Sequence, residues 1–201
     1  MVKKIIICLV LIAGSFSQVQ AEESSPVVVI DDFERELKAL PWSTDSMLKM
    51  SNDAKFGKQS AEFIMKANGN PMQEFQLDKS IAEQLEKISC NTITMWVKGD
   101  GSDSNCYFTF IEREEGKKVE AFGCITPISL KDTSWHKVSL KLGEFTYGAT
   151  WGEGEEGDKV LRLRYLLAYR IYCNKDSYER RFLIDHIQGE KVEETFYKTI
   201  K

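Results

Sequence analysis

Residues 91–126 alternate between apolar runs and polar segments in the way that β-strands alternate with their connections. Three runs rich in Ile, Val, Thr, Phe, Tyr and Trp are separated by two segments of glycine and charge. These residue types suit a pleated, half-buried surface, and none of the runs contains the proline that would interrupt a central strand. The pattern predicts three consecutive antiparallel strands, a β meander, at the centre of the fold.

Runs of the same kind lie on both sides of this meander. We expect further strands at 27–34, around Leu48 and Met50, and within 60–69, 74–80, 135–142, 162–174 and 180–192. Residues 81–88 hold the one helical pattern, and Ser80 is its candidate N-cap. Residues 143–158 contain five glycines and five acids among aromatic residues, which predicts a long exposed loop.

The predicted elements indicate one fold class. The strands are short, turn residues separate them, and helices do not alternate with them. We therefore expect an all-β domain, a two-sheet antiparallel β-sandwich of the jelly-roll type with one short helix.

The N-terminal residues have the pattern of a secretory signal peptide. Lys3 and Lys4 precede the apolar run 5–14, which is too short to span a bilayer, and Cys8 lies inside that run rather than after a lipoprotein motif. We therefore expect a secreted or periplasmic protein without membrane insertion. The predicted organisation is a signal peptide at 1–21 cleaved after Ala21, a polar leader at 22–26, a jelly-roll domain at 27–192 and a charged tail at 193–201.

The charge of the chain disfavours polyanionic partners. The whole sequence has 27 basic and 31 acidic residues, a net charge of −4. Cleavage after Ala21 would remove two lysines and no acids, which leaves 25 basic against 31 acidic residues, or −6. We therefore expect neither nucleic acid nor an anionic membrane as partner.

Four cysteines would remain after cleavage: Cys90, Cys106, Cys124 and Cys173. An even number in an exported protein favours two disulfides, whereas free thiols would be expected in a reducing compartment. A three-residue hairpin loop at 114–116, with glycine in the left-handed conformation, would place Cys106 opposite Cys124 and within disulfide reach. Cys90 and Cys173 are then left to pair with each other.

Signatures of catalysis are weak in this sequence. The only histidines, His136 and His186, lie in predicted strands outside any nucleophile motif. Acids do recur in groups, namely Asp32, Glu34 and Glu36 on one strand face and Glu153, Glu155, Glu156 and Asp158 in the glycine-rich segment. A glycosidase or lyase of jelly-roll fold needs two facing acids. These groups could supply them, so such an enzyme stays open as an alternative.

Several motifs together resemble a known family. They are DDFE (31–34) followed by Trp42, FGKQSAEF (56–63), TMWVKGDGS (94–102) leading to TSWHKVSL (133–140), and the closing LIDHI (183–187). In this order and spacing, they resemble carbohydrate-binding modules of the galactose-binding-like jelly-roll class, in particular the family 11 modules and the complex I intermediate-associated domains. The resemblance covers roughly residues 27–190, although a shared fold does not by itself settle function.

The resemblance implies a structural calcium ion. The matching ligands are the acids Asp32, Glu34 and Asp185 and the backbone carbonyls of the turn from Lys55 to Lys58. Oxygen ligands of this kind suit calcium. The alternative is that these acids are surface charges and that Asp185 pairs with a lysine or arginine.

Candidate sugar contacts come from strand alternation and from the resemblance. The strand at 162–174 is expected to direct Leu163, Tyr165, Leu167, Tyr169, Ile171 and Cys173 to the core and Arg164, Arg170, Tyr172 and Asn174 outward. The hairpin register places Tyr107 and Thr109 opposite Gly123 and Ala121. Flat sugar faces stack on exposed aromatic rings, and the resembled modules carry tyrosines, arginine and aspartate on a concave sheet. The candidate ligand-binding residues are Trp96, Tyr107, Tyr147, Trp151, Arg170 and Tyr172, although core packing is the alternative for most of these rings.

The sequence therefore favours an exported, non-catalytic module that binds a polysaccharide or glycan. Two alternatives remain. One is the carbohydrate-active enzyme of jelly-roll fold, and the other is a protein-interaction domain of an envelope assembly.

Overall fold

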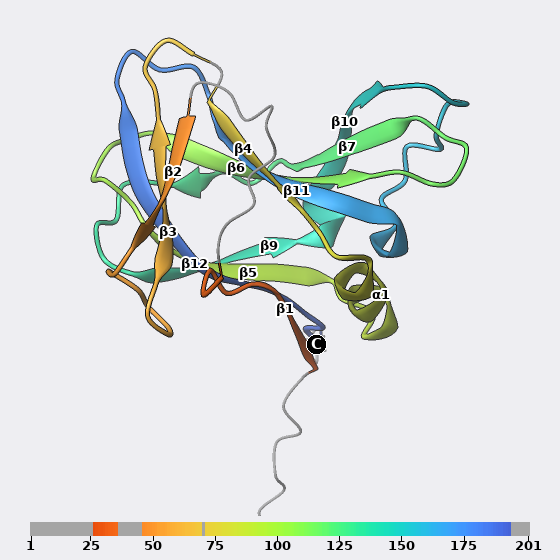
Figure 1. The fold of residues 1–201 in the computed structure, drawn as a ribbon, viewed down its shortest axis with the longest axis horizontal. Helices are drawn as coiled ribbons and strands as arrows, with labels where there is room; N and C mark the ends of the chain where they lie inside the picture. The colour runs from red at the N-terminus through yellow and green to blue at the C-terminus, as the bar shows by residue number, and fades with distance from the viewer. Residues whose placement is uncertain (1–25, 36–45, 70, 194–201) are drawn as a thin grey trace, which may run out of the picture.

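The computed structural model describes residues 26–35, 46–69 and 71–193 (Figure 1). The predicted signal peptide at 1–21, nearly all of the leader at 22–26 and Trp42 lie outside the described residues, as does the tail at 193–201 beyond its first residue.

Two antiparallel sheets of six strands each build the domain, which confirms the predicted fold class. Sheet A comprises β1 (Val27–Asp31), β2 (Ser46–Ser51), β3 (Ser60–Met65), β5 (Thr92–Lys98), β9 (His136–Lys141) and β12 (Arg180–Glu190). Sheet B comprises β4 (Met72–Gln76), β6 (Asn105–Glu112), β7 (Val119–Cys124), β8 (Ile128–Ser129), β10 (Phe145–Trp151) and β11 (Leu166–Cys173). Sheet A has the order β2-β3-β12-β5-β9 with β1 beside β12, and sheet B has the order β10-β7-β6-β11-β4 with β8 beside β6 (Figure 1).

Aromatic side chains join the two sheets in the core. Phe63 stacks on Phe182 within sheet A, and Phe75 and Phe108 stack on Tyr169 within sheet B. Phe63 also meets Phe75 edge-on, with ring centroids 6.0 Å apart, so the two stacks touch. All five rings are almost fully buried, and each contributes about 2 kcal/mol or more through removal of apolar surface from water.

The expected meander is wrong in its pairing. The three predicted strands form, but β5 belongs to sheet A, whereas β6 and β7 belong to sheet B. The crossing between the sheets begins at Gly99. A side chain would not fit at this position, because a Cβ there would lie 2.0 Å from the carbonyl oxygen of Leu130. Alternation identifies a half-buried strand but does not identify its neighbour, and this explains the error.

The segment 143–158 is also more ordered than expected. Residues Leu142–Glu144 form a 3-10 turn, η1, and Phe145–Trp151 form strand β10, which pairs with β7. The Phe, Thr, Tyr and Trp residues of this stretch have high β-propensity, and the neighbouring strand supplies the hydrogen bonds. The loop is therefore confined to the residues that follow Trp151.

Local boundaries differ from expectation at several places. Helix α1 (Lys79–Lys87) has Asp78, not Ser80, at its N-cap position, and no side chain caps it. β1 stops at Asp31, whose carboxylate accepts the N–H of Phe33 at 2.9 Å. Phe33 itself has a positive φ of 56°, so the chain turns here. β11 starts at Leu166, because the preceding residues form a second 3-10 turn, η2 (Leu163–Tyr165).

The β6–β7 hairpin loop is longer than predicted, which changes the cysteine geometry. Gly116 does adopt a positive φ of 76°, but the last register pair is Glu112 with Glu120. The register is therefore shifted by two residues, and Cys106 is not opposite Cys124.

The expected Cys90–Cys173 pair is not formed either. The Cys90 thiol lies in the sheet A half, next to Leu85 and Gly189, whereas Cys173 is on β11 of sheet B. All four described cysteines are buried and unpaired in the structure, so neither disulfide predicted from the sequence is present.

Candidate functional site

The outer face of sheet B, directed away from sheet A, carries a groove. Along β11, Tyr169, Ile171 and Cys173 are buried in the core as predicted, so the alternating residues Arg170 and Tyr172 face outward. A β-bulge between Leu166 and Ala168 changes the alternation near the start of the strand. Leu167 is consequently 43% exposed rather than in the core.

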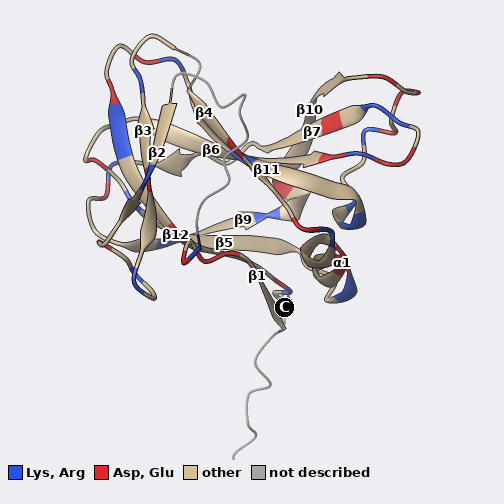
Figure 2. Ribbon diagram, in the orientation of Figure 1, with Lys and Arg blue, Asp and Glu red and all other residues tan. Residues whose placement is uncertain are grey.

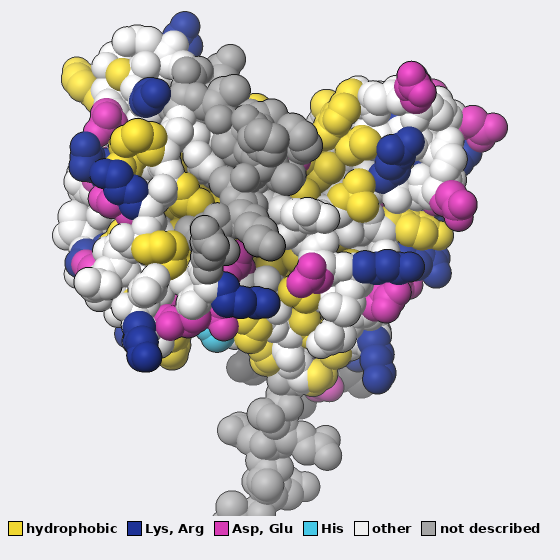
Figure 3. All heavy atoms as spheres, viewed as in Figure 1, with side chains coloured by type: hydrophobic (Ala, Val, Ile, Leu, Met, Phe, Trp, Pro, Cys, Tyr) yellow, Lys and Arg dark blue, Asp and Glu magenta, His cyan; other side chains and the backbone are white. Residues whose placement is uncertain are grey.

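Two hollows on this face form successive rows across the same strands. One, of about 390 Å³, is lined by Met72, Thr109, Ala121, Gly123, Ala149, Arg170 and Tyr172, among others. The other, of about 1370 Å³, includes the next outward residues of the same five strands, namely Glu74, Ile111, Val119, Trp151 and Ala168. Figure 3 shows the molecule hollowed between the part that carries β2 to β4 and the part that carries β7 and β10. We call this continuous surface the sheet B groove.

Small residues keep one part of the groove open. Gly123 faces Thr109 across the β6–β7 register, and a Cβ at Gly123 would lie 3.6 Å from the Thr109 hydroxyl. Ala121 and Ala149 are a register pair on the neighbouring strands. The predicted partners were Gly123 for Tyr107 and Ala121 for Thr109, which is wrong because of the two-residue shift.

A pair of tyrosines flanks this open part. Tyr107 and Tyr172 are opposed on β6 and β11, and their rings stack with centroids 5.1 Å apart. The amide of Asn174 donates to the Tyr107 hydroxyl at 3.2 Å. The pair therefore presents apolar ring surface and hydroxyl groups together, the two features that a sugar requires.

An ion pair lies between the two hollows. The Nε and Nη2 atoms of Arg170 donate to one oxygen of Glu74 at 3.0 and 2.6 Å. The Glu74 side chain is only 6% exposed, while that of Arg170 is 22% exposed. The guanidinium also lies 5.9 Å from the ring centroid of Trp151. Glu74 thus fixes a cation against an aromatic ring inside the groove.

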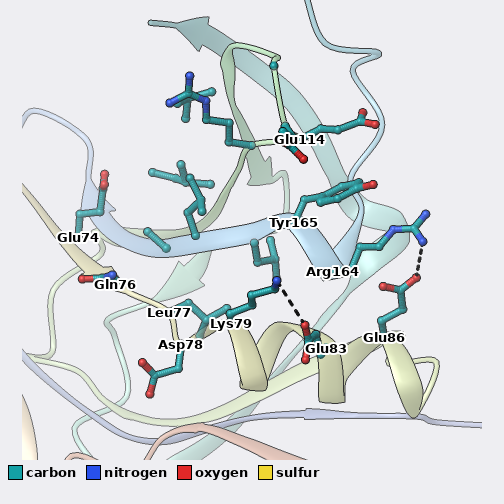
Figure 4. A pocket seen from close by; sticks show the side chains of 18 of the residues that line it. Glu74, Gln76, Leu77, Asp78, Lys79, Glu83, Glu86, Glu114, Arg164 and Tyr165 are labelled. Carbon is teal, nitrogen blue, oxygen red and sulfur yellow. Dashed lines mark ion pairs between the residues drawn. The ribbon is translucent and has the colours of Figure 1, made fainter. Parts of the chain in front are cut away.

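Helix α1 closes one end of the groove with paired charges. Figure 4 shows Glu83 and Glu86 on α1, with Tyr165 and Glu114 on the opposite side of the groove. Glu86 pairs with Arg164 at 3.7 Å, and Glu83 pairs with Lys79 at 3.8 Å. These pairs are largely exposed, so they contribute little to stability but set the polarity of this end.

Three of the six predicted ligand contacts line the groove, namely Trp151, Arg170 and Tyr172, and a fourth, Tyr107, stacks on Tyr172 beside it. Trp96 does not, because it lies on β5 of sheet A, where Phe56 meets its ring edge-on and the Lys55 ammonium lies 4.3 Å from its centroid. Tyr147 is also separate. A bulge between Tyr147 and Ala149 turns its ring toward Phe122 and the core.

The sequence prediction missed the contribution of β4. Met72, Glu74 and Gln76 alternate along this strand and line the groove. The alternation was visible in the sequence, but nothing local indicated that β4 pairs with β11, about a hundred residues later.

Two glutamates face each other close to the groove but beneath its surface. Glu112 and Glu120 are a register pair, and both are almost fully buried. Glu112 accepts the N–H of Arg162 at 2.6 Å, and Glu120 accepts the N–H of Lys159 at 3.2 Å. Burial raises the pKa of Glu112 to about 7, and the charge of Glu120 adds to this effect. Because the segment around 157–162 covers both acids, they anchor this loop instead of facing the groove.

Exposed ion pairs also attach the loop after β10 to the β6–β7 hairpin. Lys117 pairs with Glu155 at 2.7 Å, and Lys118 pairs with Glu156. Figure 2 shows the corresponding run of mixed charge on the two loops at the right of the view. The predicted acidic cluster therefore has partners in the hairpin.

Two of the acids predicted as calcium ligands, Asp185 and Glu34, bind the predicted turn, but through its N–H groups and not its carbonyls. Oδ2 of Asp185 accepts the N–H groups of Lys55 and Phe56 at 2.7 and 2.8 Å. Oε1 of Glu34 accepts the N–H of Lys58 at 2.6 Å. Residues near the two ends of the domain thus hold one turn. Asp32 instead accepts the N–H of Glu34 at 3.2 Å.

One oxygen at this turn remains without a partner. Asp185 is fully buried, burial raises the pKa of its carboxyl, and its Oδ1 has no hydrogen-bond partner. Within the described ranges Asp185 bonds to backbone amides and to no lysine or arginine, contrary to the alternative pairing. Among the described residues, no three acid, histidine or cysteine side chains converge as metal ligands. An ion here would therefore need backbone carbonyls in addition to Asp185 and Glu34. The unpartnered Oδ1 of Asp185 is one oxygen that such an ion could bind.

No protein-family model and no curated protein matches the sequence. The fold, however, is that of solved family 11 carbohydrate-binding modules. One from Clostridium thermocellum, solved with a β-1,3-1,4-mixed-linked tetrasaccharide, is 16% identical with a TM-score of 0.58, over 84% of this chain and 97% of that chain. The module CtCBM11, studied in solution, is 16% identical with a TM-score of 0.64, over 87% and 100%.

A domain of a larger enzyme is similar as well. An exo-β-agarase is 12% identical with a TM-score of 0.54, over 83% of this chain and 25% of that chain. At such identities the likeness concerns the fold.

In the described part of the chain, no helix has the length and apolar character needed to cross a membrane.

Proposed function

We propose that this protein is an exported carbohydrate-binding module that binds a polysaccharide or glycan in the sheet B groove without cleaving it. The observation that carries the proposal is the convergence of Tyr107, Tyr172 and Trp151 with Arg170 on one open sheet face. The rings supply stacking surfaces for sugar C–H faces, and the guanidinium supplies donors for hydroxyls. The fold similarity to modules solved with an oligosaccharide supports it.

The groove suits binding better than cleavage. A glycosidase needs one acid that can donate a proton and a second that acts as nucleophile or base, both facing the bond to be broken. Glu74 is held by Arg170, and the buried pair Glu112 and Glu120 binds the backbone of the covering loop. These three acids therefore have structural partners. Glu83, Glu86 and Glu114, which also line the groove, pair with Lys79, Arg164 and Arg162.

A structural calcium ion is the second part of this proposal. Asp185 and Glu34 would hold it together with backbone carbonyls of the neighbouring turn, and it would offset the charge of the buried Asp185 carboxylate. Its role would be to fix the turn between the first and last strands, away from the sheet B groove.

The test of sugar binding is a glycan array on the protein, followed by calorimetric titration of the best ligand and a reducing-sugar assay. Tyr172→Ala and Trp151→Ala each remove a ring from the groove, so we expect an affinity loss of about tenfold or more for each. Trp96→Ala is the matched control, because it removes an indole from the other sheet and should leave the affinity unchanged.

The outcomes separate the alternatives. Binding without sugar release supports the module. Release of reducing sugar would establish the carbohydrate-active enzyme, and the absence of both would favour the protein-interaction domain. Equal losses in Trp96→Ala and Tyr172→Ala would contradict the assignment of the groove.

A further inference from the structure

Two of the four described cysteines are direct neighbours across adjacent strands of sheet B. Cys106 on β6 and Cys173 on β11 are a register pair, and both side chains are buried in the core. The N–H of Cys173 donates to the carbonyl of Pro71 at 3.1 Å, on the β4 side. In an antiparallel pair, the backbone N–H and C=O groups of two opposed residues either bond to each other or both point to the strands on the far sides. Cys106 and Cys173 are therefore a non-hydrogen-bonded pair.

This type of pair has the right spacing for a disulfide. The Cα atoms of opposed residues at non-hydrogen-bonded positions lie about 4.5 Å apart, with the side chains on one face. Disulfides span Cα separations of about 4.4 to 6.8 Å. The backbone geometry thus permits the bond without movement of the strands.

The other two thiols are placed less well. The β6–β7 register, continued by one pair, puts Cys124 opposite Phe108 and so diagonal to Cys106. Diagonal neighbours are about 7 to 8 Å apart, beyond ordinary disulfide reach. Cys90 lies in the sheet A half, where its thiol donates to the carbonyl of Thr92 at 3.4 Å. The register therefore selects one pair out of the possible combinations.

We propose that Cys106 and Cys173 form a cross-strand disulfide. The oxidant is a disulfide of the exchange type, such as oxidised glutathione or the active-site disulfide of a thiol oxidoreductase. One cysteine thiolate attacks it and releases a thiol, and the second thiolate then displaces the other half from the mixed disulfide. The two cysteines lose two protons and two electrons in total. The oxidant gains them and becomes two thiols.

The bond must form during folding. Burial raises the pKa of Cys106 well above its usual value and that of Cys173 to about 12, so neither is a thiolate in the finished sheet. The unfolded or partly folded chain exposes both thiols. The cross-link is then sealed when the core closes over it.

The position of the bond connects it to the sheet B groove. The next register pair is Tyr107 with Tyr172, whose rings stack on the opposite, outward face. A disulfide at Cys106 and Cys173 would lie directly behind the tyrosines and fix the spacing of the strands that carry them. Only this consequence rests on the proposed sugar binding, since the cross-link itself requires no ligand.

The test is oxidative refolding. The reduced, unfolded protein is refolded in a mixture of reduced and oxidised glutathione, free thiols are alkylated, and non-reduced peptides are mapped by mass spectrometry. We expect a peptide linking Cys106 to Cys173, with Cys90 and Cys124 alkylated. The oxidised protein should melt about 10 °C above the same protein after reduction, because the bond closes a long loop.

Matched variants sharpen the result. Replacement of the other two thiols, Cys90→Ser with Cys124→Ser, should leave the same link, and Cys173→Ser should abolish it. If the double variant does not fold, the map of the wild-type protein decides alone. Four alkylated thiols in the refolded wild-type protein, or Cys106 linked to Cys90 or Cys124, would overturn the proposal.

Discussion

At the scale of single residues, buried acids give this protein a defined response to pH. Burial raises the pKa of Glu112 from 4.5 to about 7. Between these values the folded protein keeps a proton that the unfolded chain has lost, so stability falls as pH rises through this window. Above pH 7 Glu112 is ionised in both the folded and the unfolded state. The folded state then carries the full free-energy cost of the buried charge, at most about 3 kcal/mol.

Glu112→Gln should remove this dependence. The amide oxygen can still accept the N–H of Arg162, but the side chain no longer ionises. We expect the variant to gain stability over the wild type as pH rises from 5 to 8, measured as the free energy of unfolding in urea. Glu115→Gln, in the exposed hairpin loop, is the control and should follow the wild type. If the free energy of unfolding changed with pH in the same way for the wild type and Glu112→Gln, Glu112 would not be the source of the pH dependence.

At the scale of elements, Gly99 is tightly packed at the point where the chain changes sheets. A Cβ at this position would lie 2.0 Å from the carbonyl oxygen of Leu130 and 2.4 Å from its carbon, both backbone atoms. The N–H of Gly99 also donates to the carbonyl of Asp132 at 2.7 Å. The connection from β5 to β6 is therefore packed directly against the segment that leads into β9.

Gly99→Ala should consequently destabilise the fold. The backbone must move to accommodate the methyl group, and we expect a loss of roughly 2 kcal/mol or more in the free energy of unfolding. Gly143→Ala is the matched control, since a Cβ there meets nothing within 4 Å. Chemical denaturation of both variants provides the measurement, and equal stabilities would count against the tight crossing.

At the scale of the whole molecule, one turn links the beginning and the end of the domain. Glu34 follows β1, Asp185 lies on β12, and both bind the backbone amides between Lys55 and Gln59. The unpartnered Oδ1 of Asp185 is the place where a cation would complete this link. The stability of the whole domain should then respond to calcium.

Chelation tests this consequence. If calcium binds the folded state, protein stripped with EDTA should melt about 5 to 10 °C below protein in excess calcium. Asp185→Asn should abolish the difference, while Asp103→Asn, at an exposed surface acid, should retain it. Identical melting temperatures of stripped and calcium-loaded wild-type protein would remove the support for the ion.

Local pattern was sufficient for the fold class and for most of the strands, although it assigned the residues of β10 to a loop. The alternation of apolar and polar residues has the period of a strand, so it located β2, β3, β9 and β12 and indicated which side of β11 faces the core. It also identified Arg170 and Tyr172 as outward residues. These properties depend on neighbours along the chain, which the sequence contains.

Tertiary structure alone decided which strands are neighbours. The pairing of β4 with β11 brings Glu74 to Arg170, and the loop length in the β6–β7 hairpin shifts Cys106 from Cys124. Bulges beside Tyr147 and Leu167 reverse the face that each side chain takes. Because a strand alternates with the same period whatever lies beside it, its partner and register are set by packing over the whole chain, and so is the composition of the groove.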